Sequence, residues 1–592
     1  MRYNYEKPPA TLREALESQT VEHLRPRALH CAKELPTRKA ELIDVIVSTV
    51  HSPAQLKVLW GKFDQLSIKA ISAALDNDGL LDEDAFRAQY GKLPWDTGKR
   101  NYLISGYRKR DYLPVEVLIY GNRIPPDVIP LLTSLAPPHE KFLLTGSKEI
   151  PQTDELLVAE TEEAVLHDLA ATLRFIAEGK AAITDAAARP TTASLNKLEE
   201  RLLHGEYLQS KNAAAEEPIR SFGWLVMAQA DKLAKATGSK LTLTPKGQKV
   251  LSQPEVARLQ SIFENWQHAN QFDELTRIRS LKGFQKAKRN LSRPAERKKK
   301  ILEALKQSPV GEWIEIESFL RAVRAWRCSF EVELSDFSHL YVGDTFEYGY
   351  LNGFGSEDCW RALQAQYILV CLWEYLATLG ALDVAYTHPN DAEFELGSIR
   401  GVSNENYFSR YIGLRYFRIN PLGAYLLGVA GSYVGAAKPE SQPVFTVMPN
   451  YEIAIMHREQ FTPNVRLLLE RLAESISEGV YQLQREKILT ALETGLTLEA
   501  IHDFLISKSA HPLPQTVQVF LDDIQRNSRA LKEAGSAVLF QTTDAALAQL
   551  IVNDSALRKI CFIANETTLV VPAEKETAFR RRVKQLGFGI RR

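Results

Sequence analysis

The 592-residue chain lacks the short motifs that identify nucleotide-hydrolysing motors and zinc modules. Its Gly-Lys pairs, at Gly61, Gly91, Gly98 and Gly179, are not followed by the Ser or Thr that holds magnesium in a GxxxxGK[ST] phosphate loop. The five cysteines form no Cys-x-x-Cys pair, which argues against a zinc site or a disulfide framework. No Gly-x-Ser-x-Gly elbow, zinc-spaced histidine pair or paired-carboxylate nuclease pattern stands out. The sequence therefore predicts no ATPase core, no cofactor, no metal and no catalytic residue.

The chain also has no long hydrophobic run and no net charge. Its longest apolar stretches, such as 368–373, fall far short of the roughly 20 residues that a membrane helix needs. The N-terminus has no apolar core followed by a small-residue cleavage site. We therefore expect a cytoplasmic protein with no membrane partner. Because Lys plus Arg and Asp plus Glu both number 73, any nucleic-acid contact must come from local clusters of charge.

The strongest local charge is the basic segment 277–300, which holds eleven Lys or Arg residues and one acid, Glu296. Clustered cations bind phosphates by releasing counterions, which gives affinity without reading the base sequence. A solvated connector, or a surface that docks an acidic partner, is the alternative interpretation. The residues of this segment that we expect to contact DNA are Lys282, Lys286, Lys288, Arg289, Arg293, Lys298 and Lys299.

Two segments have the order of elements found in a winged helix. In the first, an amphipathic helix stopped by Gly179, a short helix near 184–188 and a helix at 191–203 follow one another, and after a further helix a strand runs into LTPKGQKVL (243–251). The second segment ends in INPLGAYLL (419–427), which shares the Pro, the Gly and the apolar frame. We predict that 191–203 is a recognition helix, although winged helices also serve as protein-docking modules. Its candidate DNA contacts are Thr192, Asn196, Lys197 and Arg201.

Near the N-terminus, two short helices are expected on either side of a Leu-Pro-Thr-Arg-Lys junction (35–39). Thr20 can cap the first helix, and Leu42, Ile43 and Ile46 lie on one face of the second. The arrangement resembles the SAP motif, a small DNA-binding helical hairpin, and this implies DNA contacts at Arg38 and Lys39. The copy lacks the usual glycine of that motif and has Pro26 in its first helix, so a hairpin that only packs on its neighbours is the alternative.

The C-terminal residues 443–592 contain a two-strand pattern in VFTVMPNYEIAI, three amphipathic helices and a hairpin pattern in CFIANETTLVV. Their order resembles the N-terminal domain of XPB-type helicases. That resemblance implies an α+β fold like a damage-recognition domain, placed beside a motor to present DNA to it. Four basic residues at the start of the last helix are further candidates for DNA contact. They are Arg580, Arg581, Arg582 and Lys584.

These features predict a multidomain, mainly α chain with winged-helix units and an α+β C-terminal domain. The predicted function is a non-catalytic accessory protein that binds duplex or branched DNA with little sequence preference. It would work with a separate helicase or nuclease in bacterial DNA repair or antiphage defence. A protein scaffold without DNA contact and a divergent nuclease are the alternatives. The expected parts are a SAP-like helical region at 1–95, a connector at 96–154, winged helices at 155–255 and 297–430 joined by a basic connector at 256–296, a linker at 431–442 and the C-terminal domain at 443–592.

Overall fold

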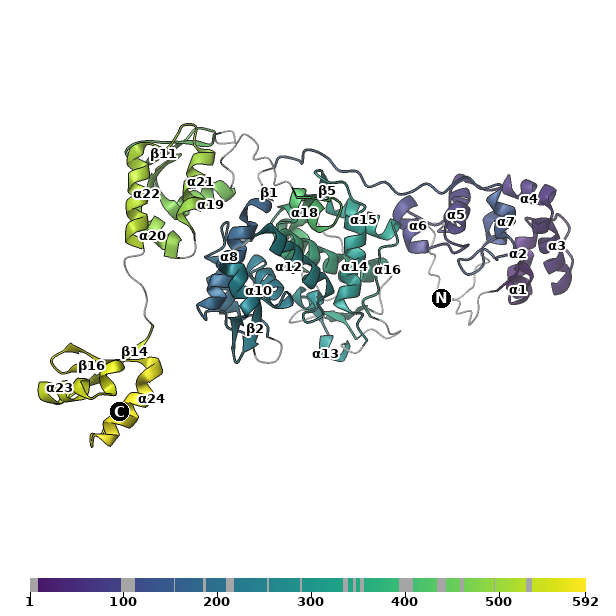
Figure 1. Cartoon of the computed structure of the whole chain (residues 1–592). Helices are drawn as coiled ribbons and strands as arrows, with labels where there is room; N and C mark the ends of the chain where they lie inside the picture. Colours follow the sequence, from purple (N-terminus) through teal and green to yellow (C-terminus); the bar gives the residue numbers. More distant parts are fainter. Residues whose placement is uncertain are drawn as a thin grey trace. The chain divides into compact units, whose positions relative to one another are not determined.

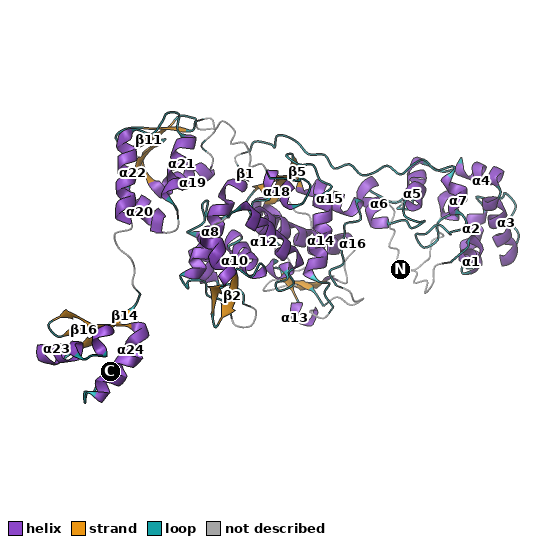
Figure 2. Cartoon of the chain, in the orientation of Figure 1, coloured by secondary structure: helices purple, strands orange, loops and turns teal. Residues whose placement is uncertain are grey.

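The computed structural model shows an α-rich chain with several small antiparallel sheets, and its C-terminal part is α+β (Figures 1 and 2). One compact unit takes in 1–444, 457–471 and 494–496, and the other takes in 445–456, 472–493 and 497–592. Among the described helices, none is long and apolar enough to cross a membrane. The described residues are 9–96, 112–153, 155–184, 188–208, 218–252, 255–287, 290–333, 339–343, 348–351, 356–392, 408–433, 443–457, 461, 463–493, 496–528 and 535–591.

The first unit begins with a helical core. Local caps set its helix starts, since Asp64 accepts from the Ser67 amide at 2.7 Å and Asp82 accepts from the Ala85 amide at 3.0 Å. The helices are α1 (Leu12–Glu17), α2 (Val21–Ala28), α3 (Lys39–His51), α4 (Pro53–Trp60), α5 (Gln65–Leu75), α6 (Glu83–Tyr90) and α7 (Ile129–Thr133).

The two helices predicted around the Leu-Pro junction are present as α2 and α3. Leu42, Ile43 and Ile46 are buried on α3, as their spacing indicates. This core also includes residues from Val115 to Leu132, which pack with the helices that precede them. Much of 96–154 is therefore part of the first core, and the boundary expected at 95 lies later in the chain. Sequence missed this because the apolar residues after 112 have no clear helical or strand period.

A second and larger core runs from Leu144 to Leu427. The two segments expected to be separate winged helices share it. The intervening 256–296 is not merely a connector, because α12 buries Leu259, Ile262 and Trp266 in this core. The helices of this core are α8 (Val165–Ala177), α9 (Thr192–Glu199), α10 (Arg220–Ala230), α11 (Pro245–Ser252), α12 (Val256–His268), α13 (Phe284–Ala287), α14 (Pro294–Leu305), α15 (Ile316–Ala325), α16 (Ser356–Trp360), α17 (Gln366–Val370) and α18 (Pro421–Leu426).

Helix α16, η5 (Arg361–Ala365), α17 and η6 (Cys371–Ala377) follow one another without a break and form a helical run at 356–377. Three antiparallel sheets accompany the helices, with the orders β1-β8-β9-β5, β2-β3 and β4-β6-β7. Their strands are β1 (Leu157–Ala159), β2 (Ala234–Thr237), β3 (Lys240–Leu243), β4 (Leu281–Lys282), β5 (Trp313–Glu315), β6 (Tyr341–Gly343), β7 (Tyr348–Tyr350), β8 (Leu382–Tyr386) and β9 (Leu414–Ile419).

The central core contains the same order of elements twice. The first half runs α8, a short bridge at Ala182, α9, α10, β2, β3 and α11. The second half runs α14, β5, α15, the helical run, β8, β9 and α18. Each half therefore has a helix, an extended segment, two helices, a hairpin-like strand pair and a closing helix.

The start of the closing helix is built in the same way in both halves. Thr244 Oγ1 accepts from the Gly247 amide at 3.1 Å, and Asn420 Oδ1 accepts from the Gly423 amide at 2.9 Å. Pro follows the capping residue in both places and suits the first helical turn. Both capping side chains also donate to the carbonyl of a residue with positive φ, which is Lys232 in the first half and Gly380 in the second.

The glycine of each closing helix lies against the preceding strand entry. A Cβ at Gly247 would be 2.1 Å from the Leu233 carbonyl oxygen, and a Cβ at Gly423 would be 1.9 Å from the Ala381 carbonyl oxygen. Glycine is thus required at both positions by the same close backbone approach. The sequence alignment of 243–251 with 419–427 has a structural counterpart.

The third helices of the two halves pack on one another. Helix α10 contacts η6. A Cβ at Gly223 of α10 would be 2.2 Å from the Glu374 carbonyl oxygen, so the two backbones approach as only glycine permits. Every position from Arg220 to Gln229 is buried, which means that α10 has no solvent-facing side.

In the second unit, both strand patterns expected from the sequence are present. The first sheet has the order β10-β11-β13-β12 and the second has the order β14-β16-β15. The C-terminal body, defined as 535–591, has its own core, which includes Ala548, Leu569, Phe579 and Val583. The elements from 445 onward are β10 (Phe445–Val447), β11 (Glu452–Ile455), α19 (Pro463–Leu472), β12 (Ala473–Ser477), β13 (Val480–Leu483), α20 (Arg485–Glu493), α21 (Leu498–Lys508), α22 (Gln515–Ser528), β14 (Ala537–Gln541), α23 (Ala545–Asn553), β15 (Phe562–Asn565), β16 (Thr568–Pro572) and α24 (Glu576–Gln585).

We expect Gly423→Ala to lower the free energy of unfolding of the central core by about 1–3 kcal/mol, because the new methyl group must displace backbone atoms. The matched control is Gly431→Ala, since nothing lies within 4 Å of a Cβ at that position. Thermal unfolding followed by circular dichroism measures both variants. Equal midpoints for the two would contradict the packing described here.

Candidate nucleic-acid interface

Arg277, at the start of the basic segment, is buried in an ion pair. Its Nη2 lies 2.8 Å from Glu374 Oε2, and neither side chain reaches solvent. Tyr411 donates its hydroxyl to the same carboxylate. Burial raises the pKa of Glu374, and the neighbouring guanidinium of Arg277 offsets part of that rise. The Arg277–Glu374 ion pair holds the start of the basic segment against the helical run, so the Arg277 guanidinium is not accessible to a phosphate.

A second buried pair holds Lys298, one of the predicted DNA contacts. Its Nζ lies 3.1 Å from Glu274 Oε1, and only 1 % of its side chain is exposed. The adjacent Arg297 pairs with Asp273 at 2.7 Å. Burial alone would lower the pKa of Arg297, but Asp273 outweighs it and the pKa is raised. Lys298 is therefore a core residue in this structure, with no route from its ammonium to DNA.

The rest of the basic segment is more accessible where it is described. Lys282 on β4, Arg293 before α14 and Lys299 on α14 are exposed. Lys286 lies on α13, and its side chain is outside the described part of the structure. Lys288 and Arg289 lie outside the described residues. Among the described side chains of the segment, three of the predicted contacts thus remain open to solvent.

The predicted recognition helix is shorter than expected and holds a different place in its half. Helix α9 ends at Glu199, and among the described residues it is the second helix of the first half. The short helix expected near 184–188 falls largely outside the described residues, which omit 185–187. Thr192 and Lys197 are exposed and Asn196 is half-buried. Arg201 lies beyond the helix end, largely buried, and its charge is paired with the part-exposed Glu178 at 2.8 Å.

The third helix is the one that enters the major groove in winged helices and related helix-turn-helix folds. In the first half that helix is α10, and in the second half it is the helical run at 356–377. Because α10 is buried along its length and packs on η6, it presents no face to a groove. Apolar periodicity cannot distinguish this arrangement from an isolated winged helix, since both bury the same stripe.

At the N-terminus, Arg38 precedes α3 and is 83 % exposed, with Glu41 at 3.8 Å. Lys39 is exposed and donates from Nζ to the Glu17 carbonyl at 2.7 Å. Arg38 is therefore the freer cation of this predicted pair. Its place before the first turn of α3 leaves it able to reach an anion in solvent.

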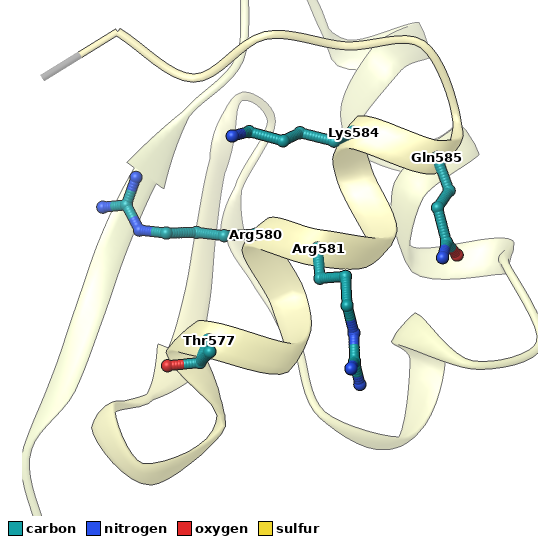
Figure 3. Close-up of a pocket in the computed structure, with 5 residues that line it drawn as sticks. All are labelled: Thr577, Arg580, Arg581, Lys584 and Gln585. Carbon is teal, nitrogen blue, oxygen red and sulfur yellow. The ribbon is translucent and has the colours of Figure 1, made fainter.

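A further cationic surface lies on the outer face of α24. The inner face buries Phe579 and Val583, which are four residues apart and pack on the sheet of the C-terminal body. The outer face carries the residues that line a shallow pocket (Figure 3), namely Thr577, Arg580, Arg581, Lys584 and Gln585.

The four predicted cations of α24 are not equivalent. Arg582 pairs with Asp554 at 2.7 Å, and Arg580 pairs with Glu576 at 2.6 Å. Arg581 and Lys584 are exposed, and no ion-pair partner for either lies among the described residues. Arg581 and Lys584 project to different sides of the helix in Figure 3. The two cations are therefore accessible from different sides of α24.

The sequence did not single out Thr577 and Gln585, which also line the pocket. Their spacing of four residues on either side of Arg581 is the signal that could have found them, because residues four apart share a helix face. A hydroxyl and an amide add hydrogen-bonding groups beside the cations without adding charge. The pocket thus suits a phosphate backbone better than a bare cation cluster does.

Comparison with known families agrees with part of the resemblance drawn from the sequence. Residues 447–566 match a family model described as "Helicase conserved C-terminal domain". The C-terminal part of this chain is similar to a helicase-associated domain. That match runs from the last residue of β10 through β15, and β16 and α24 follow it in the C-terminal body. No curated protein matches the chain significantly. Within the described residues, no group of three or more His, Cys, Asp or Glu is placed to hold a metal ion.

We expect Lys298→Glu to lower the free energy of unfolding by about 3–5 kcal/mol, because it leaves two carboxylates together in the core. The neighbouring exposed Lys299→Glu is the matched control and should change that free energy by no more than about 0.5 kcal/mol. Urea unfolding measured by tryptophan fluorescence compares them. If Lys298→Glu unfolds like the wild-type chain, the buried pair with Glu274 is not part of the folded core.

Proposed function

We propose that this chain is a non-catalytic accessory protein that binds DNA and works with a separate helicase or nuclease in bacterial DNA repair or antiphage defence. The observation that carries the proposal is the solvent-facing cationic surface of α24. It belongs to the same C-terminal body as part of the region similar to a helicase-associated domain. The resemblance of 443–592 to the N-terminal domain of XPB-type helicases supports the finer assignment, in which this region presents DNA to a motor.

The two halves of the central core are, on this proposal, winged helices fused through their third helices. The repeated element order and the matching caps at Thr244 and Asn420 support it. With α10 buried, the central core contributes to DNA binding only through side chains at its surface. The proposed surface contacts are Lys282, Arg293, Lys299, Thr192, Asn196 and Lys197, together with Lys286, Lys288 and Arg289.

The form of DNA recognition follows from the residue types. Arg581, Lys584 and the exposed Arg38 are suited to phosphates, which carry no sequence information. Bidentate readers of base edges need Arg, Asn or Gln on a helix that fits the major groove, and α10 has no free face for that role. Binding to duplex or branched DNA with little sequence preference is therefore the activity that these residues support best.

A protein scaffold is the second candidate. Lys298, Arg201 and Arg277 are all buried in ion pairs, so much of the charge that favoured DNA serves the fold. In this alternative the surfaces of the central core bind other proteins and the chain joins them. The two candidates differ in whether the chain binds DNA. The accessory-protein proposal requires binding that depends on the cations of α24, and the scaffold requires none.

We expect Arg581→Glu/Lys584→Glu to weaken duplex DNA binding about tenfold or more at low salt, since each removed cation is a lost phosphate contact. The slope of log K against log salt should become shallower by roughly two, one for each cation. Fluorescence anisotropy of a labelled duplex at 50–200 mM salt, the range over which this effect is large, measures both quantities.

The control for this experiment is Lys33→Glu/Lys57→Glu, which changes the net charge equally at two exposed positions of the N-terminal core. It should leave affinity nearly unchanged. A salt-independent affinity, or equal effects of the two double variants, would contradict the DNA-binding proposal and favour the scaffold.

We also expect the isolated chain to hydrolyse no ATP and to cut no DNA. Phosphoryl transfer by motors of this kind requires a phosphate loop with its Lys and Ser or Thr, and the sequence has none. ATPase and nuclease assays with DNA, in magnesium and in manganese, test this. Turnover that follows the protein peak through a second purification step would contradict the accessory role.

A further inference from the structure

The sheet of the C-terminal body has one covered face and one open face. Phe540, Ile563 and Leu569 point toward the core formed with α23 and α24. Residues alternate along a strand, so the side chains between these positions point the other way. The three strands are antiparallel in the order β14-β16-β15, with both helices packed on the covered face.

An apolar row crosses the open face. Val570 of the central strand is paired with Leu539 on one side and with Phe562 on the other. Leu539 is 66 % exposed and Phe562 is 57 % exposed. The open face of an antiparallel sheet is ordinarily polar. A contiguous row of three apolar side chains there marks a contact surface.

The open face carries no charge of its own. Besides the apolar row, its outward positions are Ala537, Gln541, Thr568 and Pro572, and Asn565, which pairs with Thr568 after a bulge in β15. A partner on this face therefore meets an uncharged surface with one aromatic ring, Phe562. A charged protein surface would lose hydration here without gaining a counterion.

The surroundings of the face are cationic. Residues 535–592 contain nine Lys or Arg and five Asp or Glu. Arg558 and Lys559 precede β15, and Lys575 follows β16, so all three lie at the end of the sheet that carries Phe562. All three are exposed, and Lys575 forms a solvent-exposed ion pair with Glu574 at 3.7 Å, so Arg558 and Lys559 are the less constrained cations. An uncharged aromatic surface edged by cations matches the two parts of a nucleic-acid strand, its flat bases and its phosphates.

We propose that the open face binds single-stranded DNA, with an unpaired base stacked on Phe562 and adjacent phosphates at Arg558, Lys559 and Lys575. The inference rests on the proposed DNA-binding function and names the strand form that this surface takes. A duplex hides the faces of its bases in the stack, so only an unpaired strand can use the ring. Leu539 and Val570 extend the platform for the neighbouring nucleotide.

The test compares a 20-nucleotide oligo-dT strand with an abasic strand of the same length, each bound to the full chain. The wild-type chain should bind the dT strand more tightly, because both strands offer phosphates and only one offers bases. Phe562→Ala should weaken dT binding about tenfold and leave abasic binding unchanged. Phe562→Trp should restore it, since its ring also stacks.

The matched control is Leu550→Ala, which removes a half-exposed apolar side chain of α23, a helix on the covered side of the sheet. It should not alter binding to either strand. An RNA strand of the same base sequence is a further arm. Preference for that RNA over dT would overturn the assignment to DNA.

Equal affinity for the dT and abasic strands, or unchanged dT binding in Phe562→Ala, would overturn the inference. The DNA-binding proposal would survive that result if Arg581→Glu/Lys584→Glu still weakened duplex binding. If Phe562→Ala instead converts an oligomer to a monomer in sedimentation, the open face is a self-association surface and the inference is also wrong.

Discussion

The close approach of α10 to the helical run is the constraint on which the central core depends. Gly223 lets the two backbones meet at the Glu374 carbonyl, and the side chain of the same Glu374 accepts the Arg277 guanidinium. Glu374 thus takes part both in the close contact between α10 and η6 and in the ion pair that positions Arg277, which follows α12. Replacing either Arg277 or Glu374 would leave the other charge buried without a partner. The resulting loss of stability would exceed the net contribution of the intact ion pair.

That constraint limits which cations and helix faces are accessible to a ligand. The third helices that read DNA in winged-helix proteins are here covered by one another, and several cations of the basic segment are held in the ion pairs around them. Accessible charge remains at the surface of the core, before α3 and on α24. On the proposed function, these accessible cations are the groups that would contact a phosphate backbone.

Sequence predicted the elements better than their packing. Caps and periodicity found α2, α3, the two closing helices and the strands of the C-terminal region, because those signals are local. The fate of Lys298 was not predictable, because its partner Glu274 lies 24 positions earlier and only the fold brings them together. The ion pairs of Arg201 and Arg277 could not be predicted for the same reason, since Glu178 and Glu374 are also distant in sequence. On α24, by contrast, the exposed cations Arg581 and Lys584 and the buried Phe579 and Val583 lie on a single helix, so local periodicity was enough to separate its two faces.

The doubled architecture of the central core has a consequence for its physical behaviour. Two similar modules that met as separate chains would form a dimer whose population depends on protein concentration. Here they are covalently joined, so their association is intramolecular and proceeds at a high effective concentration. The interface between them persists at any dilution, and the halves are free to diverge in sequence. The different insertions, such as the residues around 330–356 in the second half alone, are what that freedom permits.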